Sequence, residues 1–144
     1  MVGILVVSHG KLADALISSV QMLVGKFHRV QSISIWPEDK PQEIERLIEK
    51  GIREVDDGEG VVILTDILGG TPTNLSLSVP QDKKVEVVTG VNLPMLLTLW
   101  SHRGRKPLRE IGRLAQKAGR RSIILAKGMW HRRGRKADSS RGKP

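Results

Sequence analysis

Three polar side chains stand where apolar runs of the chain end, and their types fit phosphoryl chemistry. His9 follows the run VGILVVS, Asp66 closes GVVILTD, and Asn92 follows KVEVVTG. An imidazole can accept a phosphoryl group covalently, and a neighbouring carboxylate can fix its tautomer and stabilise its charged form. If the runs are neighbouring strands of a parallel sheet, these residues lie at its ligand-binding end.

The segment GGTPTN at 69–74 predicts an anion site beside them. Gly69 and Gly70 free the backbone for close approach, Pro72 suits the first turn of a helix, and Thr71 is expected to cap that helix. Backbone N–H groups and the Thr71 hydroxyl would then hold phosphate oxygens.

Gly10 places a second set of backbone N–H groups next to His9, at the start of the following helical pattern. The sequence contains no G-x-x-x-x-G-K-[ST], no G-x-G-x-x-G after the first strand and no G-x-S-x-G. This excludes the P-loop, the dinucleotide fingerprint and the nucleophile elbow. A histidine without nucleotide-binding motifs favours a phosphoryl group delivered by another protein, and we expect no cofactor and no metal.

Hydrophobic periodicity predicts the elements that position these residues. Short apolar runs rich in β-branched residues indicate buried strands, and apolar spacings of three and four indicate helices. Strands are predicted at 2–8, 30–36, 60–66, 84–90 and 121–126, and helices over 11–23, 41–55, from 72, 92–100 and 108–118.

The alternation of strands and helices predicts an α/β fold, an open, mostly parallel doubly wound sheet with helices on both faces. The length suits one domain, which we place at 1–126. Residues 127–144 are basic and poor in apolar side chains, so we expect a disordered tail.

Charge is unevenly distributed along the chain. The net charge of +9 arises from residues 101–144, which carry 15 Lys and Arg against 2 acidic residues. There is no cysteine, no apolar run long enough for a membrane span and no signal-peptide pattern. We therefore expect a cytoplasmic protein.

Three segments together resemble a known family, the IIA component of the mannose-type phosphoenolpyruvate-dependent sugar phosphotransferase system. They are ILVVSHGKLADAL at 4–16, VVILTDILGGTPTN at 61–74 and VTGVNLPMLL at 88–97. The resemblance covers roughly residues 1–126 and leaves the basic tail without a counterpart.

The resemblance implies that His9 is phosphorylated by the carrier protein HPr, that Asp66 hydrogen-bonds its imidazole, and that Thr71 contacts the phosphate. It also implies a homodimer that exchanges a C-terminal edge strand, here RSIIL at 121–125. The phosphoryl group would pass to a separate IIB component or report to a regulatory partner, so contact with a membrane would be indirect, through a sugar permease.

Two other function classes remain as alternatives. A small metal chelatase also places a histidine-glycine pair after its first strand, but it would need further ligands near His9, and His28, His102 and His131 are expected at the surface. Nucleic-acid binding through the basic tail is the second alternative, as an addition to the phosphocarrier role. The low aromatic content weighs against it.

Overall fold

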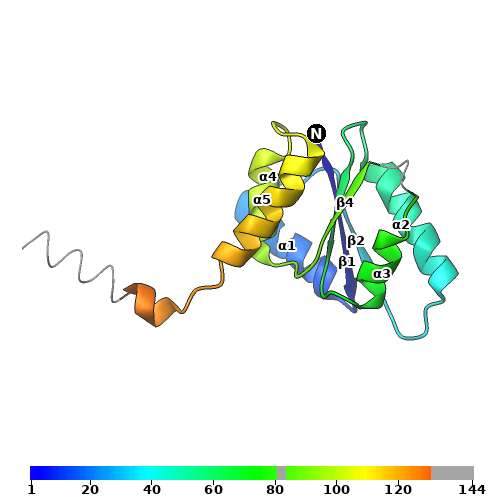
Figure 1. Cartoon of the computed structure of the whole chain (residues 1–144), viewed down its shortest axis with the longest axis horizontal. Coiled ribbons are helices and arrows are strands. Elements are labelled where there is room, and N and C mark those ends of the chain that lie inside the picture. Colours follow the sequence, from blue (N-terminus) through cyan, green and yellow to red (C-terminus); the bar gives the residue numbers. More distant parts are fainter. Residues whose placement is uncertain (81–83, 131–144) are drawn as a thin grey trace, which may run out of the picture.

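A computed structural model describes residues 1–80 and 84–130 of the chain (Figure 1). Strands and helices alternate up to the fourth strand, after which two helices follow one another. The elements are β1 (Gly3–His9), α1 (Leu12–Val24), β2 (Val30–Ile35), α2 (Pro41–Val55), β3 (Val61–Thr65), α3 (Thr71–Leu77), β4 (Val85–Val88), α4 (Leu93–His102) and α5 (Leu108–Arg121).

The four strands form one parallel sheet in the order β2-β1-β3-β4. β1 is therefore central, and Val6 lies between Ser32 of β2 and Leu64 of β3. From β1 the chain adds β2 on one side, and then β3 and β4 on the other side. The boundary between β1 and β3 is therefore the point at which the strand order reverses. A crevice is expected at the carboxyl end of this boundary.

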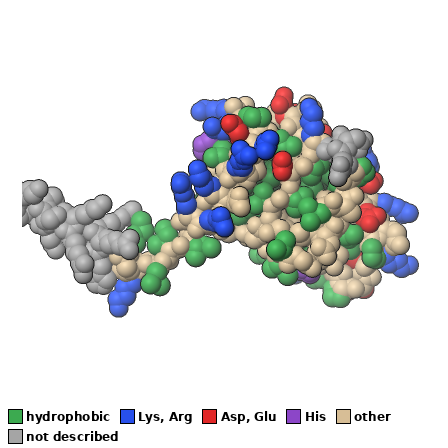
Figure 2. Space-filling view, viewed as in Figure 1, with side chains coloured by type: hydrophobic (Ala, Val, Ile, Leu, Met, Phe, Trp, Pro, Cys, Tyr) green, Lys and Arg blue, Asp and Glu red, His purple; other side chains and the backbone are tan. Residues whose placement is uncertain are grey.

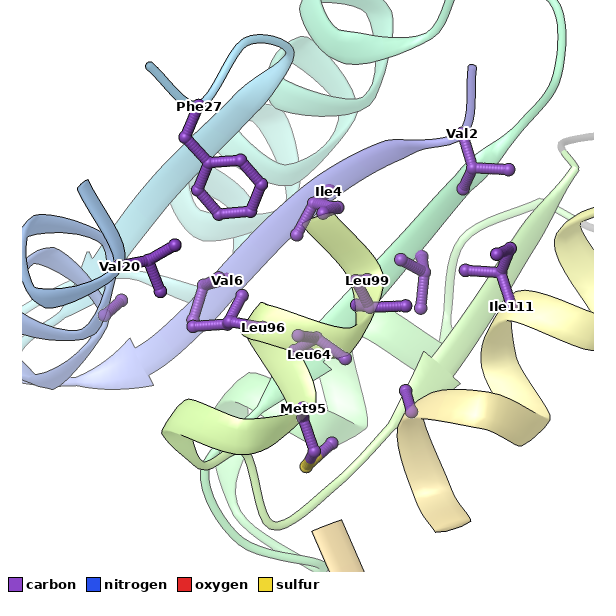
Figure 3. Packing of buried hydrophobic residues seen from close by; sticks show 13 residues of the cluster. Val2, Ile4, Val6, Val20, Phe27, Leu64, Met95, Leu96, Leu99 and Ile111 are labelled. Atoms are coloured by element: carbon purple, nitrogen blue, oxygen red, sulfur yellow. The ribbon is translucent and has the colours of Figure 1, made fainter. Parts of the chain in front are cut away.

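Helices cover both faces of the sheet, as Figure 1 shows, with α1, α4 and α5 on one side and α2 and α3 on the other. Successive side chains of a strand point to opposite faces, and β1 follows this rule. Ile4 and Val6 pack in the cluster with Leu96 and Leu99 of α4 (Figure 3). Leu5 and Val7 pack in the other cluster, against α2. Burial of both faces explains why β1 is apolar almost throughout.

Arg103 packs at the amino end of the sheet, opposite the carboxyl ends of the strands. Its side chain is buried, its guanidinium lies 5.0 Å from the centre of the Phe27 ring, and it donates to the carbonyls of His28 and Arg29. Burial first, and then the neighbouring Arg29 charge, lower the pKa of Arg103 to about 10. The hydrogen bonds of Arg103 join the segment before β2 to the loop after α4.

The C-terminal predictions are in part wrong. Arg121 ends α5, residues 123–125 are not in a strand, and residues 126–130 form a short helix within the predicted tail. A strand needs a pairing neighbour, and within this chain the segment leaves the sheet (Figure 1). Residues 131–144 lie outside the described residues, and strand exchange in a dimer stays a prediction.

No helix within residues 1–80 and 84–130 has both the length and the hydropathy that a bilayer crossing requires.

Candidate active site

His9 and Asp66 meet at the carboxyl ends of the two central strands. His9 is the last residue of β1, Asp66 follows β3, and β1 and β3 are paired with Val7 opposite Thr65. The Oδ2 atom of Asp66 lies 2.7 Å from Nδ1 of His9 and accepts the backbone N–H of the same residue at 2.8 Å. The predicted pairing of the two side chains is present in the structure.

This arrangement leaves one ring nitrogen of His9 available. An ionised carboxylate can only accept hydrogen bonds, so Nδ1 carries the proton that faces Asp66, and in the neutral ring Nε2 has the free lone pair. The His9 side chain is half exposed, whereas that of Asp66 is only 10% exposed. The half-exposed imidazole is therefore held by a nearly buried carboxylate.

The environment of Asp66 keeps its carboxylate ionised. Burial alone raises the pKa of Asp66, but the hydrogen bonds from the His9 N–H, the His9 ring and the Ile67 N–H outweigh burial, and the net pKa lies below its ordinary value. A charged acceptor is the form that orients the imidazole and stabilises its positive state.

A relay of hydroxyl groups fixes the loop on which Asp66 stands. Thr73 is buried in α3 and donates from Oγ1 to the Ile67 carbonyl at 2.6 Å, while its oxygen lies 2.6 Å from Oγ1 of Thr65. Because the Thr73 proton is committed to Ile67, Thr65 is the donor in the second bond. Thr65 and Ile67 flank Asp66 in sequence, so the relay holds the backbone on both sides of the carboxylate.

Ser8 and Gly10 hold the other side of the site. The buried Ser8 hydroxyl accepts the Ala13 N–H at 2.8 Å and thus caps α1 from the end of β1. Gly10 has a φ of +56°, which favours glycine, and its N–H donates to the Ile35 carbonyl at 2.9 Å. The predicted phosphate-binding N–H of Gly10 is therefore already used within the fold.

Gly70 lies against the ring of His9. A Cβ atom at Gly70 would stand 3.0 Å from Cε1 of the imidazole, closer than ordinary contact, although the φ of −84° suits any residue. Gly69 differs, because its φ is +82° and a Cβ there would meet nothing within 4 Å. The two glycines therefore serve separate needs, close approach at Gly70 and a left-handed turn at Gly69.

Thr71 lines the same pocket as His9, but the prediction that it caps α3 is wrong. Gly70 occupies the N-cap position, Thr71 is the first helical residue, and no side chain caps the helix start. Its side chain is exposed at the pocket. The Thr71 hydroxyl therefore does not bond the backbone at the start of α3.

Asn92, which the sequence places among the candidate phosphate contacts, does not line the pocket that His9 lines. Its Oδ1 accepts the Met95 N–H at 3.1 Å and caps α4, and its Nδ2 donates to the Gly119 carbonyl and lies 3.3 Å from the Ser122 hydroxyl. These bonds tie the start of α4 to the end of α5. The structure gives Asn92 a packing role between two helices.

A pocket of about 570 Å³ opens beside His9. One side is apolar, because Ile35 and Ile44 lie at its floor and the 41% exposed Trp36 at its wall. Within the described residues no three side chains of His, Cys, Asp or Glu gather in a way that could hold a metal ion. No observation therefore favours the chelatase alternative.

The chain is similar to known components of the phosphotransferase system. The family model EIIA-man, described as PTS system fructose IIA component, matches residues 3–115. The PTS system mannose-specific EIIAB component of Escherichia coli K12 is 30% identical over 128 residues, which are 88% of this chain and 40% of that protein. The PTS system fructose-specific EIIA component of Bacillus subtilis is 27% identical over 77% of each chain.

Solved structures of the same kind share the fold. A phosphotransferase system component EIIA from Streptococcus agalactiae aligns with a TM-score of 0.79 at 30% identity, covering 89% of this chain and 99% of that one. A PTS IIA protein associated with the fucose utilization operon of Streptococcus pneumoniae aligns with a TM-score of 0.77 at 32% identity over 89% and 95%. The chain spans about two-fifths of the length of the E. coli relative. With the family model matching most of its length, the chain belongs to the EIIA-man family of phosphotransferase system IIA components.

Proposed function

We propose that this protein is a phosphocarrier that accepts a phosphoryl group on Nε2 of His9 from the phosphohistidine of HPr. It then passes the group to a IIB component or presents it as a regulatory signal. The observation that carries this proposal is the 2.7 Å contact between Nδ1 of His9 and Oδ2 of Asp66, which leaves Nε2 as the outward nucleophile.

The transfer balances without any added cofactor. The Nε2 lone pair attacks the phosphorus atom, the P–N bond to the donor histidine breaks, and its electron pair returns to the donor imidazole. His9 then carries a phosphoryl group on Nε2 and a proton on Nδ1, so its ring is positively charged. The Asp66 carboxylate compensates that charge, and delivery to the next acceptor reverses the same steps.

Thr71 and the backbone of the Gly69–Gly70 turn are the proposed contacts for the phosphate oxygens. Thr71 lines the pocket with an uncommitted hydroxyl, and Gly70 lets the backbone lie against the imidazole. That Thr71 and His9 line one pocket, and that Gly70 lies against the imidazole, supports a transfer with little reorganisation.

Phosphoryl transfer from a defined donor tests the proposal. The protein is incubated with phosphoenolpyruvate, enzyme I and HPr, and its intact mass is measured before and after mild acid. We expect an acid-labile gain of one phosphate that is absent in His9→Ala. Thr71→Val is expected to slow uptake by roughly tenfold and Thr71→Ser to restore it, because serine keeps the hydroxyl.

Label that persists in folded His9→Ala would overturn the assignment of the acceptor. A folded wild-type chain that takes no label from a cognate HPr would overturn the phosphocarrier proposal itself.

A homodimer formed through the C-terminal segment belongs to the same proposal. Strand β4 has only β3 as a neighbour among the described residues, and residues 86–89 line an open groove of about 680 Å³ against α5. Ile123 and Leu125 are 82% and 87% exposed. A segment of this kind from a second chain would pair the open edge and bury both side chains.

The solution mass tests the dimer. Light scattering after size exclusion should give twice the chain mass for the wild type and the monomer mass for Ile123→Lys with Leu125→Lys. A wild-type monomer at high concentration would overturn this part alone, because phosphoryl uptake is measured separately.

A further inference from the structure

Helix α5 presents an unbalanced row of positive charge. Between positions 105 and 121 the chain has seven Lys and Arg and one carboxylate, Glu110, and all of these side chains are exposed. Figure 2 shows Lys and Arg side chains gathered over this part of the surface. The seven are Arg105, Lys106, Arg109, Arg113, Lys117, Arg120 and Arg121.

Four of these residues form what we call the α5 cation row: Lys106, Arg113, Lys117 and Arg120. Together with Glu110, Leu114, Gln116 and Arg121 they line one open depression of about 640 Å³. The face turned toward the sheet carries Ile111 and Ala115, which are fully buried. The row therefore lies on the surface directed away from the core.

The row is not explained by ion pairs that support the helix. Helix α2 is of similar length but mixes both signs of charge, with Lys50 within 3.8 Å of Glu54 one turn later. No ion pair within 4.0 Å joins α5 to a carboxylate in the described part of the chain. Like charges one turn apart repel and weaken a helix, so the row carries a cost that a polyanion would relieve.

The spacing of the row fits a chain of phosphates. Positions 113, 117 and 120 are about 4.5 to 6 Å apart along the helix axis. A stacked nucleic-acid strand carries a phosphate about every 3.4 Å, so each long side chain can reach its own phosphate. A straight helix with cations at this interval matches a linear polyanion better than a single small anion.

The remaining features favour nucleic acid over a lipid surface. A membrane-binding helix needs exposed apolar side chains to insert beside its cations, and no apolar residue of α5 is exposed. Trp130, which is 75% exposed, offers a face on which an unpaired base can stack. We propose that the α5 cation row binds the phosphate backbone of single-stranded nucleic acid.

Fluorescence anisotropy with the full chain tests this proposal. The probe is a labelled 20-nucleotide single-stranded RNA, titrated at several salt concentrations. The test variant changes Lys106, Arg113, Lys117 and Arg120 to Gln. The matched control removes four exposed charges elsewhere, by changing Lys40, Arg46, Lys50 and Arg53 to Gln.

We expect wild-type binding in the micromolar range at low salt, weakening as salt rises. The test variant should bind at least about tenfold more weakly, and its log–log salt slope should be smaller by about 3, since four single-strand phosphate contacts are lost. The control variant should keep most of the affinity. A further variant changes each Lys of the row to Arg and each Arg to Lys, and it should keep the affinity of the wild type. That result would show that the charge of the row, rather than a folding defect, accounts for the loss of binding.

Four outcomes would overturn the proposal. The first is no binding by the wild type at low salt, and the second is an unchanged salt slope in the test variant. The third is equal weakening in test and control variants. Vesicles of phosphatidylserine that bind the row while the RNA does not would assign it to a membrane and would also overturn it. None of these outcomes depends on phosphoryl uptake by His9.

Discussion

A single oxygen of Asp66 holds His9 twice, once through the backbone N–H at 2.8 Å and once through the ring nitrogen at 2.7 Å. The carboxylate therefore fixes both the position of the residue and the rotation of its ring. The other oxygen of Asp66 accepts the Ile67 N–H at 2.9 Å, so the support is itself anchored. The orientation of the imidazole is therefore built into the fold.

The lowered pKa of Asp66 predicts a loss of stability in acid. In the folded state the hydrogen bonds hold this pKa below the unfolded value of about 3.9, so the stabilisation is present above pH 4 and is lost as the pH falls through the folded pKa. Urea unfolding at pH 5 and pH 3 measures the loss. Asp66→Asn should lose less than the wild type over this interval, and an equal loss would contradict the prediction.

The contact between Gly70 and the imidazole predicts an effect on chemistry without a comparable effect on stability. In Gly70→Ala the new methyl group would push the His9 ring, so we expect phosphoryl uptake to fall by roughly tenfold while the melting temperature changes little. Gly25→Ala is the control, because Gly25 also has a positive φ, +83°, so its alanine variant costs ~1 kcal/mol in stability at the end of α1, away from His9. Only Gly70→Ala should lose uptake rate, and only the control should lose stability. An equal loss of uptake rate in both variants would argue against a steric role for Gly70.

The hydroxyl relay predicts that Thr73 stabilises the loop under Asp66. Thr73→Val keeps the shape but leaves the Thr65 hydroxyl and the Ile67 carbonyl without their partner, at a cost of about 1–3 kcal/mol. Chemical denaturation measures that cost. Thr73→Ser keeps the hydroxyl and should recover most of the stability and of the uptake rate. A valine variant as stable as the wild type would show that the relay contributes nothing.

Arg103 predicts the opposite pattern, a loss of stability with the chemistry intact. Arg103→Met removes the donor to the His28 and Arg29 carbonyls and the contact with Phe27, so we expect the free energy of unfolding to fall by about 1–3 kcal/mol. Phosphoryl uptake below the melting temperature should stay near the wild-type rate, because the site lies at the other end of the sheet. A large loss of rate in the folded variant would disprove this separation.

The sequence predicts the sheet well because β1 and β3 are buried on both faces and therefore nearly uniform in apolar content. From those strands the meeting of His9 and Asp66 follows, since the carboxyl ends of paired parallel strands share one edge. The sequence also predicts a turn at Gly69 and Gly70 that allows close approach of the backbone. The positive φ of Gly69 and the contact of Gly70 with the imidazole are visible only in the structure.

Other residues depend on contacts that no local pattern encodes. Asn92 stands at a strand end like a ligand, yet its partner Gly119 is 27 residues away on α5. Ser8 and Thr73 carry short hydroxyl side chains whose partners the sequence does not reveal. Residues 123–125 have strand-forming side chains, but a strand also needs a neighbour, and none of residues 1–80 and 84–130 pairs with this segment.

Under the proposed function, the two-residue link between β1 and α1 affects how long an encounter with a donor or acceptor protein must last. Ser8 joins the start of α1 to the end of β1 by a hydrogen bond, and the Gly10 N–H is hydrogen-bonded to the Ile35 carbonyl. The backbone on both sides of His9 is therefore fixed. In a relay, each complex has to dissociate quickly enough to free the protein for its next partner. An imidazole that is already oriented needs no rotation of its ring after the partner binds, so a brief and weak complex would be sufficient for the proposed transfer.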